Sequence, residues 1–397
     1  MSADSTERIA LLRDERFWKI AFQVIVLAIV IGLISLFIGN MNINLKKSGL
    51  ELSFDFLQNS ANFSIGETPI EYSSSNSYIY AFWVGVLNTL RVILAGFILT
   101  TLLGVFAGVA SFSGNWLVRK ISLVYVEIIR NIPLLLQLIF WYFAVFLNLP
   151  RTQEQLQLPG SVFMSKAGIS IPWPDISLGF WLWFAVLVAG AIAAIVIWKW
   201  RTYAIVEKSE SGQTQSLILA GLGIAALVIF FFGFNWQFPA LPIDAATQEL
   251  DPTRSPIGGL KLSLEYAALL TGLVVYTAAF IAEIVRGGIQ SVSRGQWEAA
   301  RSLGLPSGLV MRLVVLPQAL RVIIPPLSSQ YMNLAKNSSL ALAIGYPDLY
   351  SVNQTIFNQT GRPVEAFILL MATYLTISLT ISVVMNLLNR SVQLQER

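Results

Sequence analysis

The sequence predicts an all-α membrane protein with about eight transmembrane helices. Hydrophobic residues make up 55% of the 397-residue chain and charged residues only 12%, about half the share of a soluble domain. Several apolar runs reach about 20 residues, the length at which a helix crosses the hydrocarbon core of a bilayer. The basic residues are also distributed unevenly between alternate connections, as membrane orientation requires.

Apolar runs separated by polar stretches define the segments in order. The first run follows a basic flank and resembles a signal peptide, but it is too long and lacks a small-residue cleavage site. Polar stretches at 40–79, 148–178 and 238–260 are expected to be external loops. The membrane segments are expected at about residues 17–39, 81–112, 125–147, 179–198, 216–236, 262–285, 313–344 and 364–388.

The lysines and arginines predict the orientation. With both termini in the cytoplasm, the connections facing the cell interior hold 15 of these residues and the external loops hold 7. This asymmetry places residues 286–312 in the cytoplasm and explains the pI of about 9.2 without nucleic-acid binding. The cytoplasmic set is Arg8, Arg13, Arg16, Lys19, Arg119, Lys120, Lys199, Arg201, Lys208, Arg286, Arg294, Arg301, Arg312, Arg390 and Arg397.

Residue types that are absent exclude several kinds of chemistry. The chain has no cysteine and no histidine, which removes disulfides, Cys/His metal sites, cysteine nucleophiles and a Ser-His-Asp triad. It also has no G-x-x-x-x-G-K-[ST] phosphate loop, so it does not bind ATP in the P-loop manner. We therefore expect no catalytic residue, metal or cofactor in this chain.

The cytoplasmic stretch 293–321 predicts a helix, a turn and a second helix. Gln296–Leu303 has good helix propensity, Gly304 suits the left-handed residue that ends a helix, and Pro306 suits the first turn of the next. Small and charged side chains on the first helix suit close contact with another protein, although an amphipathic connector in the headgroup region is the plainer interpretation. The contact residues predicted here are Glu298, Ala299, Ala300, Arg301, Gly304 and Pro306.

These residues carry a family resemblance. Glu298-Ala299-Ala300, followed by Gly304 and then by the Leu316-Pro317 pair, resembles the EAA loop of ABC-importer permeases. Four further stretches, in the family's order, resemble its polar amino acid branch. They are "GVLNTLRV" (85–92), "YVEIIRNIPLLLQLIFWYF" (125–143), "AFIAEIVRGGIQSV" (279–292) and "YMNLAKNSSLALAIGYPDL" (331–349).

The resemblance implies a type I permease core of five helices, formed by residues 81–147 and 262–390. Residues 1–80 would add one helix and an external loop, and 148–261 would be an insertion with two extra helices. Residues 286–312 would hold the coupling helix that docks on an ATPase subunit.

The same resemblance implies the function and the partners. The chain would be the permease subunit of an importer that carries amino acids across the bacterial inner membrane by alternating access. Cytoplasmic subunits would bind ATP and Mg, and a periplasmic binding protein would deliver the substrate. A second, different permease chain would complete the pathway in the lipid, and no nucleic acid would be involved.

Ionisable and polar residues within the segments are candidates for function, because they are costly in a bilayer. Local spacing predicts two ion pairs, Glu127 with Arg130 and Glu283 with Arg286, whereas Arg91 has no evident partner.

The predicted seventh segment contains the polar run "NLAKNSSLAL" at 333–342. This run follows Pro325 and Pro326, which are expected to break the helix. Interhelical hydrogen bonding is an equal explanation for these polar groups. The predicted substrate contacts are Asn333, Asn337, Ser338, Ser339 and Gln137, with Glu365 as partner to an ammonium group.

Three other functions remain open at this point. A secondary transporter could use Glu283 or Glu365 as a proton carrier. A membrane-embedded enzyme has little to work with, given the missing histidine and cysteine. A permease of the same family could carry opines or cationic amino acids instead.

Overall fold

The structure, a computed structural model, describes residues 15–47, 51–208, 212–243, 250–251 and 253–392. The predicted cytoplasmic residues Arg8, Arg13 and Arg397 lie outside this part of the chain.

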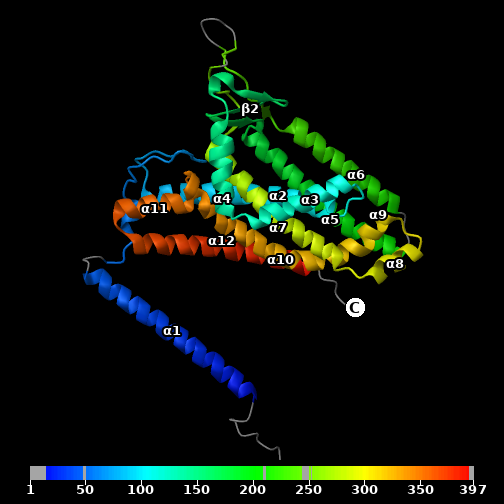
Figure 1. The fold of residues 1–397 in the computed structure, drawn as a ribbon, viewed down its shortest axis with the longest axis horizontal. Coiled ribbons are helices and arrows are strands. Elements are labelled where there is room, and N and C mark those ends of the chain that lie inside the picture. The colour runs from blue at the N-terminus through cyan, green and yellow to red at the C-terminus, as the bar shows by residue number, and fades with distance from the viewer. Residues whose placement is uncertain (1–14, 48–50, 209–211, 244–249, 252, 393–397) are drawn as a thin grey trace, which may run out of the picture.

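Four long helices form the central bundle: α2 (Tyr78–Ala110), α7 (Leu264–Gln290), α10 (Leu316–Asn337) and α12 (Pro363–Val392). They lie side by side along the long axis in Figure 1. The predicted all-α membrane class is confirmed, since six described helices are long and apolar enough to span a bilayer. The shorter apolar stretch Leu217–Gly233 and one bent pair supply the remainder of the expected set.

Glycines bring α2 and α7 into close contact. Gly104 and Gly108 are four residues apart on α2, the spacing that lets membrane helices approach. A Cβ at Gly104 would lie 2.6 Å from the Cβ of Ile281, and one at Gly108 would lie 2.7 Å from that of Val285. This seam fixes the register of the two helices along their length.

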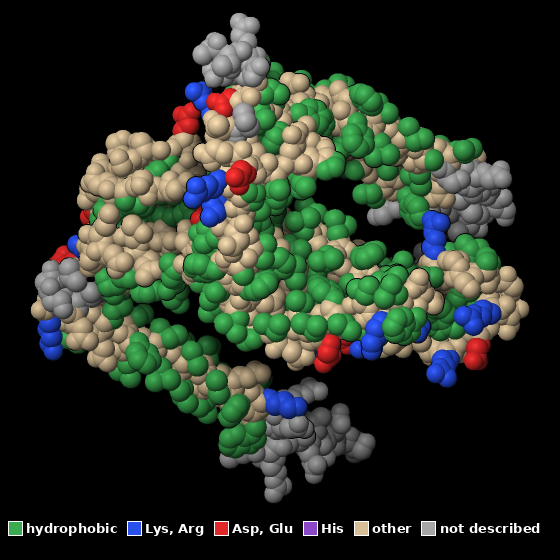
Figure 2. Space-filling model, turned by 45° about the horizontal axis from the view of Figure 1, so that its top comes forward, with side chains coloured by type: hydrophobic (Ala, Val, Ile, Leu, Met, Phe, Trp, Pro, Cys, Tyr) green, Lys and Arg blue, Asp and Glu red, His purple; other side chains and the backbone are tan. Residues whose placement is uncertain are grey.

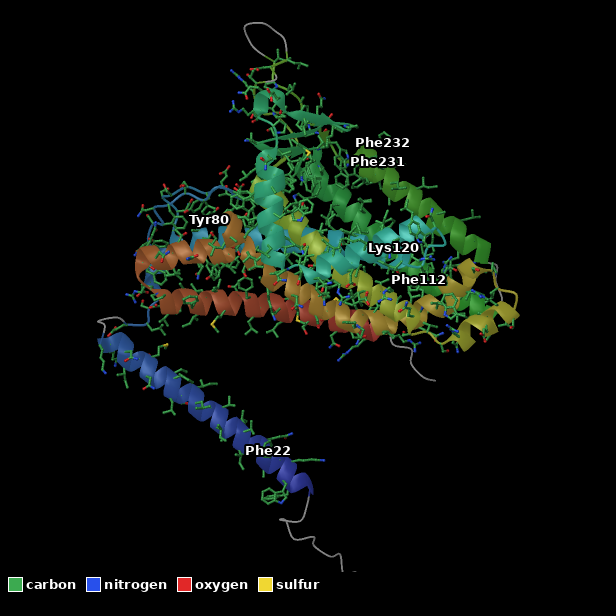
Figure 3. The ribbon with its side chains drawn as sticks, viewed as in Figure 1. Phe22, Tyr80, Phe112, Lys120, Phe231 and Phe232 are labelled. Carbon is green, nitrogen blue, oxygen red and sulfur yellow. The ribbon has the colours of Figure 1, made fainter. Side chains whose placement is uncertain are left out.

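The first helix, α1 (Glu15–Lys47), stands beside the bundle rather than within it (Figure 1). None of its predicted span is buried against the chain, and Phe22 projects from it far from the other helices (Figure 3). Its apolar surface is therefore left for lipid or another protein.

The segment expected at 125–147 is not one continuous helix. The chain forms α3 (Trp116–Asn131) and α4 (Leu134–Ile139), bent by 107° with respect to each other, and α4 continues through a π-turn (Phe140–Val145) and a 3₁₀ turn (Phe146–Asn148). The break lies at Pro133, which has no N–H to donate and forces Ile132 into an extended conformation.

The extra central region holds a helical hairpin and two small sheets. The hairpin consists of α5 (Leu178–Lys208) and α6 (Gly212–Val228), and α6 ends in a π-turn (Ile229–Gly233). At that end Phe231 and Phe232 point away from the bundle (Figure 3).

The predicted external loops 148–178 and 238–260 are partly strands, which the all-helical expectation missed. An antiparallel sheet has the order β1-β2-β3-β6, with Met164 paired to Ile169 and Ile169 paired to Leu262. Its strands are β1 (Leu156–Leu158), β2 (Val162–Ser165), β3 (Gly168–Ile171) and β6 (Leu260–Leu262). A second pair joins β4 (Trp173–Pro174) to β5 (Trp236–Gln237), and 3₁₀ turns occupy Asp55–Gln58 and Thr152–Glu154.

The remaining elements lie at the two ends of the bundle. The short helices α8 (Arg294–Ser302) and α9 (Ser307–Val310) precede a π-turn (Met311–Val315) at one end. At the other end α10 passes into a 3₁₀ helix (Ser338–Ile344), and α11 (Leu349–Thr360) follows. Figure 2 shows Lys and Arg side chains around the α8 end, with a largely hydrophobic face between the ends.

The expected helix break at Pro325 and Pro326 does not occur. Both prolines lie inside the continuous helix α10. Their missing N–H groups leave the carbonyls of Arg321 and Val322 without the usual partners four residues on, but hydrogen bonding resumes on both sides. The helix therefore lacks two backbone hydrogen bonds at this point but continues past both prolines to Asn337.

Candidate coupling helix and polar sites

The helix α8 ends as the sequence predicts. Gly304 has φ +75°, the Gly304 N–H donates to the Arg301 carbonyl at 2.9 Å, and the Leu305 N–H donates to the Ala300 carbonyl at 3.3 Å. This pair of bonds is the Schellman motif, which satisfies the last carbonyls of a helix. Pro306 is the N-cap residue of α9, so the helix–turn–helix prediction is confirmed.

The two faces of α8 differ. Ala300 is buried and packs with Val310 and Val315 in the chain's own core, which anchors the helix to the bundle. Glu298, Ala299 and Arg301 are exposed on the surface around it. Leu303 is also exposed, at 81% of its surface. The surface that α8 offers to another protein is thus charged at its edges and apolar at Leu303, while Ala300 lies on the inner side.

The polar run of α10 lies at the junction of two kinds of helix. Asn333 and Lys336 are exposed, Asn337 is half-buried, and Ser338 begins the 3₁₀ turn. The Ser338 hydroxyl donates to the Ala335 carbonyl at 2.8 Å, and the Ser339 hydroxyl donates to the Lys336 carbonyl at 2.8 Å. Both hydroxyls are therefore bonded within their own helix, and a role in substrate contact stays a prediction.

The other two predicted pathway residues lie in separate clusters. The Gln137 amide donates to the carbonyls of Ile129 at 2.9 Å and Ile132 at 3.0 Å, and so closes the bend between α3 and α4. Glu365 is 1% exposed and accepts from Arg362 at 3.1 Å and from the Ser53 N–H at 3.4 Å. The sequence linked them with the Asn333 run, whereas each has local partners here.

One predicted ion pair is confirmed and the other is wrong. Glu283 binds Arg286 at 2.5 Å, as expected from their spacing. Arg130 does not pair with Glu127 but lies 3.6 Å from Glu283 and 5.3 Å from the centre of the Phe280 ring. Packing of α3 on α7 brings this second carboxylate to Arg130, while Glu127 accepts from the Asn131 amide at 3.3 Å.

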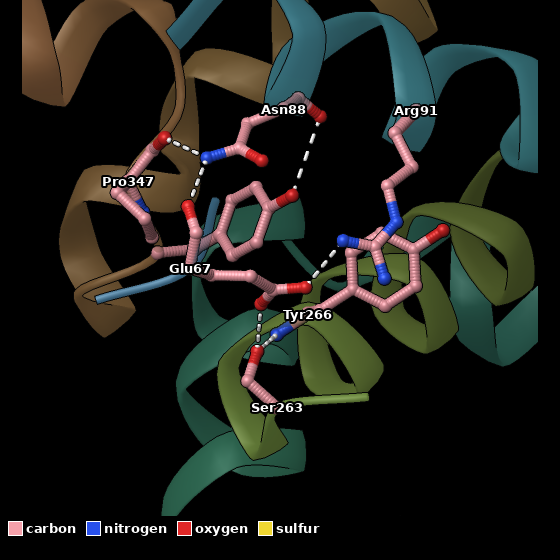
Figure 4. Close-up of polar contacts among 7 residues, drawn as sticks. Glu67, Asn88, Arg91, Ser263, Tyr266 and Pro347 are labelled. Atoms are coloured by element: carbon pink, nitrogen blue, oxygen red, sulfur yellow. Dashed lines mark hydrogen bonds and ion pairs between the residues drawn. The ribbon is translucent and has the colours of Figure 1, made fainter. Parts of the chain in front are cut away.

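Arg91 has a partner that sequence reasoning did not find. Glu67, in the loop before α2, binds the Arg91 guanidinium at 2.5 Å and also accepts from the Ser263 hydroxyl (Figure 4). The same guanidinium lies 4.4 Å from the centre of the Tyr266 ring. The only sequence signal was an unmatched arginine in a span and an acidic residue in the preceding loop.

Asp348, between the span that ends at Ile344 and α11, is the N-cap residue of α11. It accepts from the Ser351 N–H at 2.9 Å, and the Tyr374 hydroxyl lies 3.4 Å from its other oxygen. Burial raises the pKa of the Asp348 carboxyl to about 7, and backbone hydrogen bonds from Ser351 and Tyr350 offset part of that rise.

Membrane-length helices around a glycine seam, with a capped surface helix between two spans, define a multi-span membrane protein. The chain belongs to the family of binding-protein-dependent transport system inner membrane components, whose sequence profile matches residues 100–394.

Full-length relatives support the assignment. The chain is 42% identical to the putative amino-acid ABC transporter permease protein YhdX of Escherichia coli (strain K12), over 95% of this chain and 94% of that one. It is 39% identical to the general L-amino acid transport system permease protein AapQ of Rhizobium johnstonii, over 97% and 94%. It is also 41% identical to the glutamate/glutamine/aspartate/asparagine transport system permease protein BztB of Rhodobacter capsulatus, over 98% and 96%.

One solved structure, an amino acid ABC transporter crystallised with histidines, overlaps 79% of this chain and 95% of its own. Its TM-score is 0.46 at 22% identity.

Proposed function

We propose that this chain is the membrane-spanning permease subunit of an amino-acid importer driven by ATP. It would reside in the bacterial inner membrane with both termini in the cytoplasm. Separate ATPase subunits would drive alternating access, and an external binding protein would supply the substrate. The single observation that carries this proposal is α8, a capped surface helix that exposes Glu298, Ala299 and Arg301.

The energy has to reach this chain from outside. The sequence has no phosphate loop, so ATP and Mg would be bound by a partner subunit. Glu298 and Arg301 offer charges to that partner, and Leu303 offers an apolar contact. Because Ala300 packs in the core of the chain, a displacement of α8 by the partner subunit would be transmitted to α10 through the π-turn (Met311–Val315).

Exposed polar groups support a second permease chain. Asn333 and Lys336 are exposed within the span Ser307–Ile344, where contact with lipid would be costly. A second chain facing α10 would shelter them around a water-filled path. Asn337 and Ser339 are half-buried and Ser338 is buried, all next to these exposed groups in the chain. We keep these three residues as proposed substrate contacts, together with Gln137 and Glu365, which lie in separate clusters.

The amino-acid cargo is supported by the names of the three full-length relatives. Those names include general L-amino acid transport and transport of glutamate, glutamine, aspartate and asparagine. A panel of radiolabelled amino acids in competition would define which of them this chain carries.

Reconstitution tests the proposal. The permease is purified with its ATPase and second permease, placed in proteoliposomes, and supplied with binding protein outside and ATP inside. Uptake should require ATP, and Glu298→Lys or Gly304→Pro should abolish it while the subunit still inserts and assembles. Glu154→Lys, an equal charge change in the external region, serves as the control. Uptake that runs on a proton gradient without the ATPase would instead support a secondary transporter.

The ion pairs favour the ATP-driven alternative. A proton carrier has to release and rebind its proton, yet Glu283 is held by Arg286 and Arg130, and Glu365 by Arg362. In both cases a carboxylate oxygen that would have to carry the proton is already bound by a guanidinium.

A further inference from the structure

The loop that precedes α2 is closed by hydrogen bonds between residues 62–63 and 72–74, here called the neck, and residues 64–71 between them form its tip. At the neck the Asn62 N–H donates to the Ser74 carbonyl at 2.9 Å, and the Tyr72 hydroxyl donates to the Phe63 carbonyl at 2.8 Å. The Tyr72 phenol is protonated and able to donate at neutral pH, and burial raises its pKa further above the usual value near 10. Residues 64–71 form a tip held at both ends, with Glu67 near its centre.

The tip places the Glu67 carboxylate in a cationic site between α2 and α7. One carboxylate oxygen lies 2.5 Å from Arg91 Nη1, and the other accepts from the hydroxyl of Ser263. Ser263 is also the N-cap residue of α7, since its oxygen accepts from the Tyr266 N–H at 3.0 Å. Figure 4 shows these groups converging from the loop, α2 and the start of α7.

The groups around Glu67 are those that bind any carboxylate. A guanidinium forms strong charge-assisted hydrogen bonds with carboxylates, and the beginning of a helix favours negative charge. These groups therefore recognise a carboxylate whether it belongs to a side chain of this protein or to a separate molecule. The carboxylate of a free amino acid is chemically equivalent to that of Glu67.

An unused acceptor lies in the same cluster. Asn88 is fully buried, and its amide donates at 2.8 Å both to the Glu67 carbonyl and to the Pro347 carbonyl. Its side-chain oxygen has no hydrogen-bond partner among the described residues, which is uncommon for a buried polar atom. An ammonium group would satisfy it, and a free amino acid carries an ammonium next to its carboxylate.

The tip is lightly packed on its other side. Ser64, Gly66 and Thr68 are exposed, and a cavity of about 430 Å³ separates residues 62–66 from Ser351 and Thr355 of α11. Ile65 is the tip residue that packs against the core cluster containing Tyr78 and Leu349. Withdrawal of the tip therefore has to break this apolar contact together with the polar contacts of Glu67, among which the ion pair to Arg91 is the charged one.

We propose that Arg91 and Ser263, with Asn88 beside them, form an amino-acid carboxylate site that Glu67 of the same chain occupies as a tethered competitor. The inference rests on the proposed import of amino acids. The occupied state closes the outer end of the α2–α7 pair, and an incoming carboxylate exchanges with Glu67. Glu67 thereby sets how much ligand is needed to open the site.

Weakening the competitor tests the inference. In the reconstituted complex, Glu67→Gln removes the charge and should lower the half-saturating concentration of tritiated L-glutamine or L-glutamate about three- to tenfold, because a larger fraction of sites is free. Glu71→Gln, an exposed glutamate in the same tip, should match the parent protein. Adding Arg91→Ala to Glu67→Gln should remove the gain, because the ligand then lacks its guanidinium. An unchanged or higher half-saturating concentration in Glu67→Gln overturns the inference.

A reversible crosslink provides a second readout. The natural chain has no cysteine, so Ser64→Cys and Thr355→Cys can be joined across the cavity by a bis-methanethiosulfonate without other reactive thiols. The joined tip should lose at least tenfold in uptake and recover with reducing agent. The pair Ser60→Cys and Ser77→Cys, which bridges the neck, should transport normally when joined. Full transport by the joined Ser64–Thr355 pair contradicts exchange at this site.

The two proposals fail in different ways. If the parent complex shows no ATP-driven uptake of any amino acid in the panel, the proposed function is wrong. If the parent transports but Glu67→Gln and Glu71→Gln behave alike, the function stands and Glu67 is a structural anchor only.

Discussion

The Glu283 carboxylate on α7 lies 3.6 Å from Arg130 on α3 and 2.5 Å from Arg286 on its own helix. One acidic residue therefore joins two helices and pairs with two arginines near the end of the bundle that carries α8. This contact stabilises the position of α3 on α7.

Removal of that carboxylate should loosen the α3–α7 contact. Glu283→Gln leaves both arginines without this counter-charge, but all three side chains are about one-third exposed, so the loss should be only about 1 kcal/mol. We expect the thermal unfolding midpoint of the purified protein to fall by about 1 to 3 °C. Glu127→Gln is the control, because Glu127 accepts from its near neighbour Asn131 on the same helix. Equal midpoints for the two variants would contradict the assigned pairing.

Substitution of the glycine that ends α8 should weaken that helix. Gly304 has φ +75° and open space around its Cβ position, so Gly304→Ala costs only the strain of a left-handed residue, about 1 kcal/mol. Hydrogen exchange of the α8 amides should become about fivefold faster. Gly295→Ala, in the same helix with equal space and an ordinary φ, should slow exchange or leave it unchanged. Faster exchange in both variants would exclude the left-handed cap as the cause.

A larger side chain in the glycine seam should force α2 and α7 apart. Gly104→Ala would place a methyl group 2.6 Å from the Ile281 side chain, and overpacking of this kind costs about 1–3 kcal/mol. The denaturation midpoint should fall clearly, and Ile281→Ala in the same chain should restore part of the loss. Gly114→Ala has nothing within 4 Å and should be neutral. Failure of Ile281→Ala to rescue would argue that the strain lies elsewhere.

The buried carboxyl of Asp348 should make stability depend on pH. Its pKa rises from the usual value near 3.8 to about 7, so the folded state binds the proton more tightly than the unfolded state. The stabilisation is fully present below about pH 4 and is lost as pH rises through about 7, amounting to a few kcal/mol in that window.

Asp348→Asn keeps an oxygen to cap α11 but does not titrate. Unfolding midpoints between pH 5 and 8 should therefore decline less steeply for the variant than for the parent protein. A parent slope that Asp348→Asn leaves unchanged would assign the pH dependence to another group.

The parts of the fold that sequence reasoning predicted depend on short stretches of chain. Helical periodicity, the left-handed preference of Gly304 and the i,i+3 spacing of Glu283 and Arg286 all operate within a few residues. The errors came where a local rule competes with packing. Pro133 bends the chain by 107° because Ile132 becomes extended, whereas Pro325 and Pro326 are accommodated inside α10.

The small sheets had a sequence signal that helix-length apolar runs obscured. Pro159-Gly160 and Lys166-Ala167-Gly168 separate short apolar stretches, and Gly160 and Gly168 both have positive φ in the resulting turns. These strands are only three or four residues long, too short for alternation to be distinctive.

The sequence by itself determined the membrane class, the apolar segments, the position and end of α8, and the family. Composition, run length and motif order are properties of the linear chain, so they need no coordinates. Only the tertiary structure decided which charges meet. Arg91 binds Glu67 from a loop 24 residues away, and Arg130 binds Glu283 rather than Glu127. The reason is that helix packing, fixed here by close approach at Gly104 and Gly108, selects partners by distance in space, and sequence spacing carries no record of that distance.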